Sequence, residues 1–291
     1  MFLFFQFLSA NSYKLSPVTV QIKIDHNIKL MGSCSSSQKI DDFMHKCMFL
    51  PPTKINPKMI SMVNLDPYAN LCQIKNGELI ISYLQIHKQN NNQKKWLVFS
   101  HGNAATIFDY YYYAKQLNNE LNVGCVFYDY PGYGFSTGYP TEESCIDTLE
   151  LVVNHLVTKI QIPKNDIILI GQSIGTGVIV SYAHKHQWTS PIVLISPYKT
   201  ILSVVLDTSA TSLTQYIDKF MSLPKIKDLN CPIKIFHGTN DNIVPISHGK
   251  ALAAACTNKT FDPVWLPGVG HKDILEHIDM EDLFEVVNYH N

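Results

Sequence analysis

The sequence predicts an α/β fold, in which helices cover both faces of a mostly parallel central sheet and a small lid is added. Two observations lead to this expectation. Short apolar runs of strand length recur along the chain, and helical stretches separate them. Strands that are apolar without strict alternation are typical of parallel sheets, because crossover helices bury both faces. A chain of 291 residues can bury such a core as one domain.

The first half of the chain contains three of the expected strands. Leu79–His87 is rich in isoleucine and alternates in part, and Trp96–Ser100 is almost wholly apolar. The polar residues 89–95 between them are typical of a hairpin loop, so we expect the sheet to be mixed. A helix over 107–119 and a buried strand over Cys125–Tyr128 are expected next.

The second half repeats the alternation of strand and helix. The stretch 142–158 is expected to be a helix because its apolar residues recur at helical spacing. Residues Pro197–Cys231 contain no strand-like run and form the expected lid. The remaining expected elements are the strands Ile167–Ile170, Ile192–Ile195, Ile233–Phe236 and Val264–Leu266 and the helices 174–186, 247–256 and 273–289.

Residues 1–42 are expected to be a disordered extension that carries a lipid anchor, and residues 43–291 the folded domain. Within the extension, Met31 begins a match to the N-myristoylation pattern M-G-x-x-x-[ST], with Gly32 as the acylated residue. One acyl chain anchors only marginally, so we expect palmitate on Cys34 as a second anchor. The pattern operates only if translation starts at Met31. With an earlier start it is a chance match in a serine-rich linker, and both alternatives stay open.

Composition excludes several classes of protein. The net charge is −1 and lysine and arginine form no concentrated stripe, so a nucleic-acid partner is not expected. The seven cysteines are scattered without C-x-x-C spacing, which is typical of neither a disulfide framework nor a zinc site and favours a reducing compartment. We find no metal-ligand cluster or phosphate-binding glycine loop, so no cofactor is expected.

No run of the chain approaches the roughly 20 apolar residues that span a bilayer. Phe43–Pro52 is a shorter apolar segment with one basic residue. It is either an element that touches a membrane or a helix packed on the core, and the packed helix is the favoured interpretation.

Gly171–Gly175 match the pattern G-x-S-x-G and lie directly between an expected strand and an expected helix. In α/β hydrolases this sharp turn exposes a nucleophilic serine at a helix N-terminus, and small neighbours let the backbone bend. The pattern in this context predicts the α/β-hydrolase fold with Ser173 as the nucleophile.

In this fold an acid and then a histidine follow the nucleophile. Asp241 lies in the loop after the strand 233–236, and His271 lies in a glycine-lined loop after the strand 264–266. We therefore expect His271 to be the general base and Asp241 to orient it. The alternatives are His237 and His248 near Asp241, the lid residues Asp207, Asp218 and Asp228, and Asp129, which precedes Ser173 and is expected to brace a loop.

An oxyanion hole needs backbone N–H groups aimed at the developing negative charge. One is expected from Ile174, which follows the nucleophile. The other is expected from Asn103, in the loop after the strand 96–100, where Gly102 allows close approach. His101 is expected to support this loop.

Several motifs occur together in a fixed order. They are Phe49–Pro52, Ser100–Ala104, Tyr128–Gly134, Gly171–Gly175, His237–Asp241, Ser247–Gly249 and Gly270–Ile274. This set, which spans roughly residues 43–275, resembles the α/β-hydrolase domain-containing protein 17 family.

The resemblance implies a serine hydrolase that removes palmitate from thioesters on membrane-bound proteins and is itself anchored by an acylated N-terminus. It implies the catalytic triad Ser173, Asp241 and His271. The implied partners are S-acylated membrane proteins and a membrane surface, on the cytoplasmic face of the plasma or endosomal membrane.

The chain departs from this family in two places. It lacks the family's dense N-terminal cysteine cluster, and residues 202–220 match poorly. Two other functions therefore stay open. One is a carboxylesterase or monoacylglycerol-type lipase with the same triad, and the other is a catalytically idle scaffold used for binding.

Overall fold

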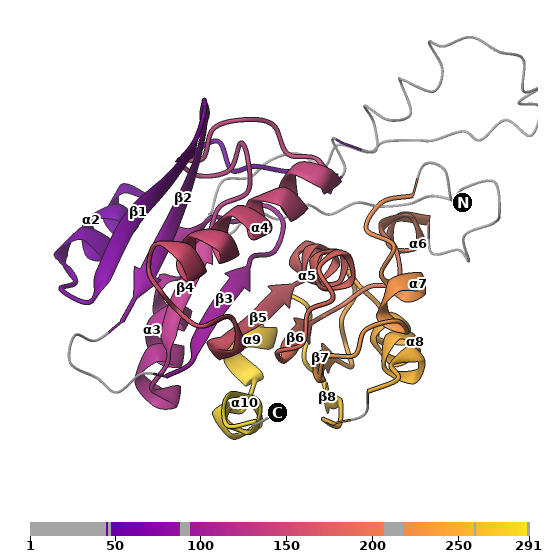
Figure 1. Cartoon of the computed structure of the whole chain (residues 1–291). Coiled ribbons are helices and arrows are strands. Elements are labelled where there is room, and N and C mark those ends of the chain that lie inside the picture. The colour runs from indigo at the N-terminus through magenta and orange to yellow at the C-terminus, as the bar shows by residue number, and fades with distance from the viewer. Residues whose placement is uncertain (1–44, 46–47, 88–93, 207–217, 259, 290–291) are drawn as a thin grey trace, which may run out of the picture. The chain divides into compact units, whose positions relative to one another are not determined.

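A computed structural model describes most of the folded part of the chain. The described residues are 45, 48–87, 94–206, 218–258 and 260–289. Contacts divide the chain into two compact units, Met1–His45 and Lys46–Asn291. The second unit contains every element described below (Figure 1). Gly32 and Cys34 lie outside the described residues.

An eight-stranded sheet forms the centre of this unit, in the order β1-β2-β4-β3-β5-β6-β7-β8. The strands are β1 (Ala69–Asn76), β2 (Leu79–Ile86), β3 (Trp96–Ser100), β4 (Gly124–Tyr128), β5 (Ile167–Gln172), β6 (Ile192–Ile195), β7 (Ile233–Gly238) and β8 (Val264–Leu266). The pairs β1–β2 and β2–β4 are antiparallel, and all other pairs are parallel. The expected mixed, mostly parallel sheet is confirmed.

The expected hairpin around residues 89–95 is wrong. β4 lies between β2 and β3, so the strands on either side of that stretch are not neighbours. The hairpin is formed instead by β1 and β2, whose turn contains Gly77 with φ of 60°. A polar stretch shows where a strand ends, but the partner of that strand is decided by the cross-strand contacts of the whole sheet.

The described helices are α2 (Pro57–Leu65), α3 (Tyr111–Leu121), α4 (Glu142–Thr158), α5 (Ile174–Lys185), α6 (Ile201–Leu206), α7 (Ser222–Ile226), α8 (Ile246–Ala255), α9 (Ile274–His277) and α10 (Met280–Val287), with 3₁₀ turns η1 (Ile107–Tyr110) and η2 (Lys164–Asp166). Helices α3, α4, α5 and α8 lie near the stretches where periodicity predicts helices, whereas α2, α6 and α7 were not predicted. The bounds of α4 agree with the expected helix, whose start is set by the Thr141 capping box. The expected final helix is two helices, because Asp279 caps a separate α10.

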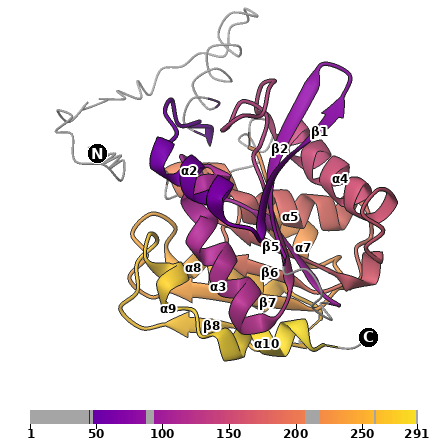
Figure 2. The same cartoon turned by 90° about the vertical axis from the view of Figure 1, so that its left-hand side faces the viewer.

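Two hydrophobic clusters lie on opposite faces of the sheet. Side chains alternate along a strand, so Val98 of β3 belongs to one cluster and its neighbours Leu97 and Phe99 to the other. The first cluster includes residues of α4, α5 and α8, and the second includes residues of α3 and α10. Figure 2 shows α2 and α3 on one side of the sheet and α4 and α5 on the other.

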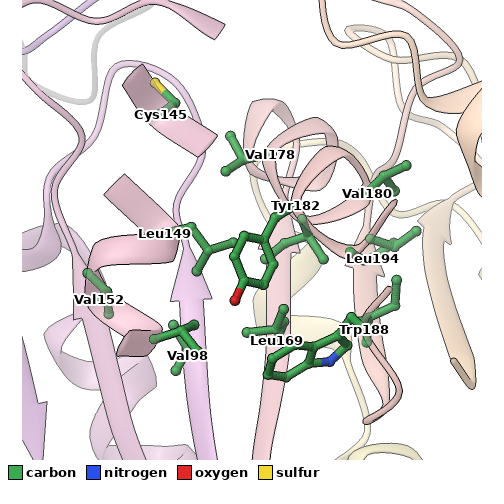
Figure 3. Close-up of a cluster of buried hydrophobic side chains, with 14 of the residues drawn as sticks. Val98, Cys145, Leu149, Val152, Leu169, Val178, Val180, Tyr182, Trp188 and Leu194 are labelled. Carbon is green, nitrogen blue, oxygen red and sulfur yellow. The ribbon is translucent and has the colours of Figure 1, made fainter. Parts of the chain in front are cut away.

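Helices α4 and α5 cover the middle of the sheet by close packing of large side chains. In Figure 3, Leu149 and Val152 of α4 and Tyr182 of α5 lie over Val98 and Leu169 of the strands. All five side chains are almost fully buried. This packing holds α5 against β5, and the turn between these two elements carries Ser173.

The expected lid, Pro197–Cys231, contains α6 and α7 and no strand among its described residues. Phe220 in this segment is fully buried, and its backbone N–H donates to Glu142 Oε1 at 2.9 Å. Met48 and Phe49 are also buried, at 5% and 4% exposure. The packed interpretation of this apolar segment is therefore confirmed for these two residues. Among the described residues, no helix has the length and apolar character of a membrane span.

Candidate active site

Ser173 lies at the sharp turn from β5 into α5. Its backbone has φ of 51° and ψ of −120°, a strained conformation for a residue with a side chain. Neither glycine of the motif could carry a side chain, because neighbouring backbone atoms lie too close. A Cβ on Gly171 would lie 2.5 Å from the carbonyl oxygen of Gly175, and a Cβ on Gly175 would overlap the carbonyl oxygen of Ser100. The motif therefore lets β5, α5 and the end of β3 meet closely enough to expose the serine.

The structure brings Ser173, His271 and Asp241 together. His271 Nε2 lies 3.0 Å from Ser173 Oγ, and His271 Nδ1 lies 2.7 Å from Asp241 Oδ2. Each residue follows the carboxyl end of a parallel strand: β5, β8 and β7 in turn. These ends lie on the same edge of the sheet, where α/β folds commonly place their sites.

Asp241 is held as a buried carboxylate. Its Oδ1 accepts backbone N–H groups of Ile243 at 3.0 Å and Val244 at 2.8 Å, and its side chain is fully buried. Burial alone would raise the pKa of Asp241, but the hydrogen bond from His271 and the two backbone N–H groups outweigh it, so the pKa lies below its usual value. Asp241 is therefore charged at neutral pH, as a residue that orients an imidazole must be.

His237, an alternative base, has a different role in the structure. Its Nε2 donates to the carbonyl oxygen of Val244 at 2.7 Å and lies 3.6 Å from Asp241 Oδ2. Burial lowers the pKa of His237, although the hydrogen bond to Val244 and the charge of Asp241 oppose the shift. His237 is therefore a neutral brace of the loop that carries Asp241.

Acidification is expected to destabilise the protein through His237. The unfolded chain protonates this imidazole near a pH of about 6.5, whereas the folded state keeps it neutral to lower pH. The free energy of unfolding should therefore fall as the pH drops below about 6.5, by up to about 1.4 kcal/mol per pH unit for one proton. The free energy of unfolding can be measured by urea unfolding of the wild type and of His237→Gln between about pH 5 and 7.5. Plotted against pH, it should have a shallower slope in the variant than in the wild type. Equal slopes would contradict this role, and His184→Gln on the surface is the control.

The loop after β3 lies beside the nucleophile. A Cβ on Gly102 would lie 3.8 Å from Ser173 Cβ, and the backbone N–H of Gly102 donates to Tyr110 Oη at 3.0 Å. Tyr110 Oη donates in turn to Gln172 Oε1 at 2.8 Å. Asn103 follows Gly102 in this loop, and Ile174 follows Ser173 in the turn. The loop that carries Asn103 thus lies beside the serine at Gly102, and the role of the Asn103 and Ile174 N–H groups as oxyanion donors stays a prediction.

His101 and Asp129 form a fully buried pair beneath this loop. His101 Nε2 lies 3.4 Å from Asp129 Oδ1, which also accepts the backbone N–H of Ile107 at 3.0 Å. Tyr130 Oη donates to the carbonyl oxygen of His101 at 2.8 Å. Burial raises the pKa of Asp129, and the contact with His101 opposes the shift. The expected bracing contacts of His101 and Asp129 are present.

The remaining alternatives lie elsewhere. Asp218 Oδ1 accepts the backbone N–H of Leu202 in the lid, at 3.0 Å. Asp228 is exposed and lies 3.7 Å from His184, and His248 Nδ1 accepts the backbone N–H of Lys199 at 3.3 Å. Asp207 lies outside the described residues. No group of three or more potential metal ligands occurs within the described ranges.

The geometry supports acyl transfer. A serine hydroxyl within hydrogen-bond reach of an imidazole, which a carboxylate orients, is the arrangement of an activated nucleophile. Sequence reasoning missed the supporting residues Tyr110 and Gln172, and also Tyr133, whose hydroxyl donates to Asn103 Oδ1 at 2.8 Å. Gln172 and Tyr133 stand inside motifs already noted, but a motif does not show which side chains meet.

Comparison with known proteins agrees with the fold. A family model described as Chlamydia CHLPS protein (DUF818) matches residues 67–220. The putative α/β hydrolase L404 of Acanthamoeba polyphaga mimivirus is 39% identical over 259 residues, covering 83% of this chain and 97% of that protein. Human α/β-hydrolase domain-containing protein 17B is 34% identical over 183 residues, 63% of this chain and 62% of that protein.

A solved structure shares the fold. The Pyrococcus furiosus esterase Pf2001 superposes with a TM-score of 0.61 and 17% identity, covering 82% of this chain and 98% of that chain. Fold and site together define the class, which is the α/β hydrolases. The chain belongs to the family described as Chlamydia CHLPS protein (DUF818), whose model matches more than half of it, and it is a relative of the mimivirus α/β hydrolase. It is similar to the α/β-hydrolase domain-containing protein 17 members, and its alignment spans 62% of the length of the human one.

Proposed function

We propose that this protein is a serine hydrolase that cleaves acyl thioesters, and that its substrates are palmitoylated proteins at a membrane surface. The observation that carries the proposal is the hydrogen-bond chain from Asp241 through His271 to Ser173, at 2.7 Å and 3.0 Å. The family resemblance supports the thioester and the protein substrate.

In the proposed reaction, Ser173 Oγ attacks the acyl carbon while His271 Nε2 takes its proton. The oxygen that becomes negative accepts hydrogen bonds from the backbone N–H groups of Asn103 and Ile174. The C–S bond then breaks, the sulfur leaves with its electrons and takes the proton from His271, and an acyl-serine and a neutral imidazole remain. His271 next takes a proton from water as the water oxygen attacks the acyl carbon. The C–O bond to Ser173 breaks, Ser173 Oγ takes the proton back from His271, and the fatty acid is released. A thiolate needs less protonation than an alkoxide, so a thioester demands little of the general acid.

The proposed location is the cytoplasmic face of a membrane. It is supported by the acylation pattern at Gly32 and by Cys34 beside it. Mass spectrometry of the native N-terminal peptide tests it. A myristoylated Gly32 is the expected result, and a mature protein that starts at Met1 would contradict myristoylation.

Substrate preference is expected to favour the thioester by at least about tenfold in kcat/KM over the oxygen ester of the same acyl chain and peptide. The measurement compares a palmitoyl-cysteine peptide with the matched palmitoyl-serine peptide, and Ser173→Ala is the control for both. Equal thioester loss in wild type and control would overturn the proposal. Hydrolysis of glycerol esters with the acyl-peptides left intact would instead favour the lipase alternative.

A further inference from the structure

A three-way hydrogen-bond junction lies at the side chain of Asn103, in the loop beside the nucleophile. Asn103 Oδ1 accepts the backbone N–H of Leu50 at 3.0 Å, Tyr133 Oη at 2.8 Å and the backbone N–H of Ala104 at 3.0 Å. The N–H of Leu50 also lies 3.0 Å from Tyr133 Oη. Residues 50, 103 and 133 come from three distant parts of the sequence. These hydrogen bonds therefore connect the segment that precedes α2 to the loop of the expected oxyanion donor Asn103.

The segment that supplies Leu50 is itself firmly packed. Met48 and Phe49 are 5% and 4% exposed and belong to the hydrophobic cluster under α4 and α5. The ring of Phe49 meets the ring of Phe220 edge-on, with centroids 6.3 Å apart. Phe220 lies within the expected lid, just before α7. Met48–Leu50 thus contacts both the lid and the loop that carries Asn103.

The side chain and the backbone N–H of Asn103 belong to one residue, so fixing the first restricts the second. The next residue, Ala104, has φ of 55°, a conformation that side-chain-bearing residues adopt at a cost. The loop therefore needs outside contacts to hold its shape. Oxyanion donors work because they are already in place before the charge develops, so a loosened loop should stabilise the transition state less.

We propose that Leu50 and Tyr133 are positioning residues that hold the Asn103 N–H in place for the oxyanion. This inference rests on the proposed acyl transfer at Ser173. The segment Met48–Leu50 then supports the active site through the Leu50 N–H.

The test is Tyr133→Phe in the full chain, which removes one hydroxyl and keeps the buried ring. With a p-nitrophenyl acyl ester as substrate, kcat should fall by about tenfold while KM changes little. Loss of a whole oxyanion donor lowers kcat by about 100-fold or more, and Tyr133→Phe removes only one contact that positions the donor, so a smaller loss is expected. A trifluoromethyl ketone, which places an oxyanion in the hole, should bind weaker by the same factor. The corresponding alcohol, which forms no oxyanion, should bind unchanged.

Tyr83→Phe is the matched control. Tyr83 is also buried, and its hydroxyl contacts His155 Nε2 at 3.2 Å, away from the site. It should keep the wild-type kcat and ketone affinity. Phe49→Leu, which removes the ring contact with Phe220, should reproduce the Tyr133→Phe pattern in a weaker form.

Two results would overturn the inference: a kcat of Tyr133→Phe within twofold of the control, or equal losses of ketone and alcohol affinity. Hydrogen exchange of the backbone amides distinguishes failure of the positioning inference from failure of the proposed function. If the wild type hydrolyses no acyl substrate, the acyl-transfer proposal fails. In that case the amides of residues 101–106 still test the positioning role. Faster exchange in Tyr133→Phe than in Tyr83→Phe would support it, and equal exchange in the two variants would refute it.

Discussion

Replacing Ser173 or His271 by alanine is expected to lower kcat by at least about four orders of magnitude, with the fold retained. The two side chains act as one unit, because the hydroxyl is a poor nucleophile until the imidazole takes its proton. The double variant should therefore be no slower than either single variant. Additive losses would show that His271 is not the base for Ser173.

Covalent labelling tests the same site without a choice of substrate. A fluorophosphonate probe should label the wild-type protein on Ser173 and leave Ser173→Ala unlabelled. His271→Ala should label far more slowly. His184→Ala is the control, because that side chain is partly exposed and its contact is with Asp228. A folded wild-type protein that takes up no probe would revive the idle-scaffold alternative.

Gly175→Ala is expected to destabilise the protein by about 3 kcal/mol or more and to abolish most activity. The added Cβ would overlap the carbonyl oxygen of Ser100 and lie 2.7 Å from its carbonyl carbon. Both are backbone atoms of β3 and cannot swing away as a side chain can. The end of β3 leads into the loop of Asn103, so relief of the clash would move that loop away from Ser173.

Helix propensity alone would predict that Gly175→Ala stabilises the protein, whereas the clash predicts that it destabilises it. The sign of the measured change therefore decides between the two. Gly175 lies in α5, where alanine is intrinsically favoured over glycine by about 1 kcal/mol. Urea unfolding should show a lower free energy of unfolding for Gly175→Ala all the same. Gly77→Asn is the control, because a Cβ there meets no atom within 4 Å and asparagine tolerates positive φ. A Gly175→Ala protein as stable as wild type would contradict the packing described here.

Local patterns were enough to predict much of the fold. The apolar runs locate β3 to β8, and the bounds of α4 follow from periodicity and its cap. β1 was not recognised, because it is an edge strand that carries polar residues and has one buried position. Pairing of β2 with β4 was also missed, since no local pattern shows which strand lies beside which.

The active site, too, could be predicted only in part from the sequence. Ser173, Asp241 and His271 were chosen from motif, chain order and position after strands, and the structure brings them into contact. The junction of Leu50, Asn103 and Tyr133 had no counterpart in the sequence reasoning. Each of its residues stands in a recognisable motif, but the motifs do not show that one hydroxyl and two backbone N–H groups donate to the same acceptor, Asn103 Oδ1.

By itself, the sequence determined the class of fold, the position of seven of the eight strands and of the main helices, and the three residues expected to carry the chemistry. These follow from short-range patterns: apolar periodicity, caps and the glycines of a sharp turn. Only the tertiary structure decided the strand order, the neutral brace at His237 and the tie between Leu50 and the loop of Asn103. Such contacts join atoms far apart along the chain, and their geometry depends on how all the elements pack together.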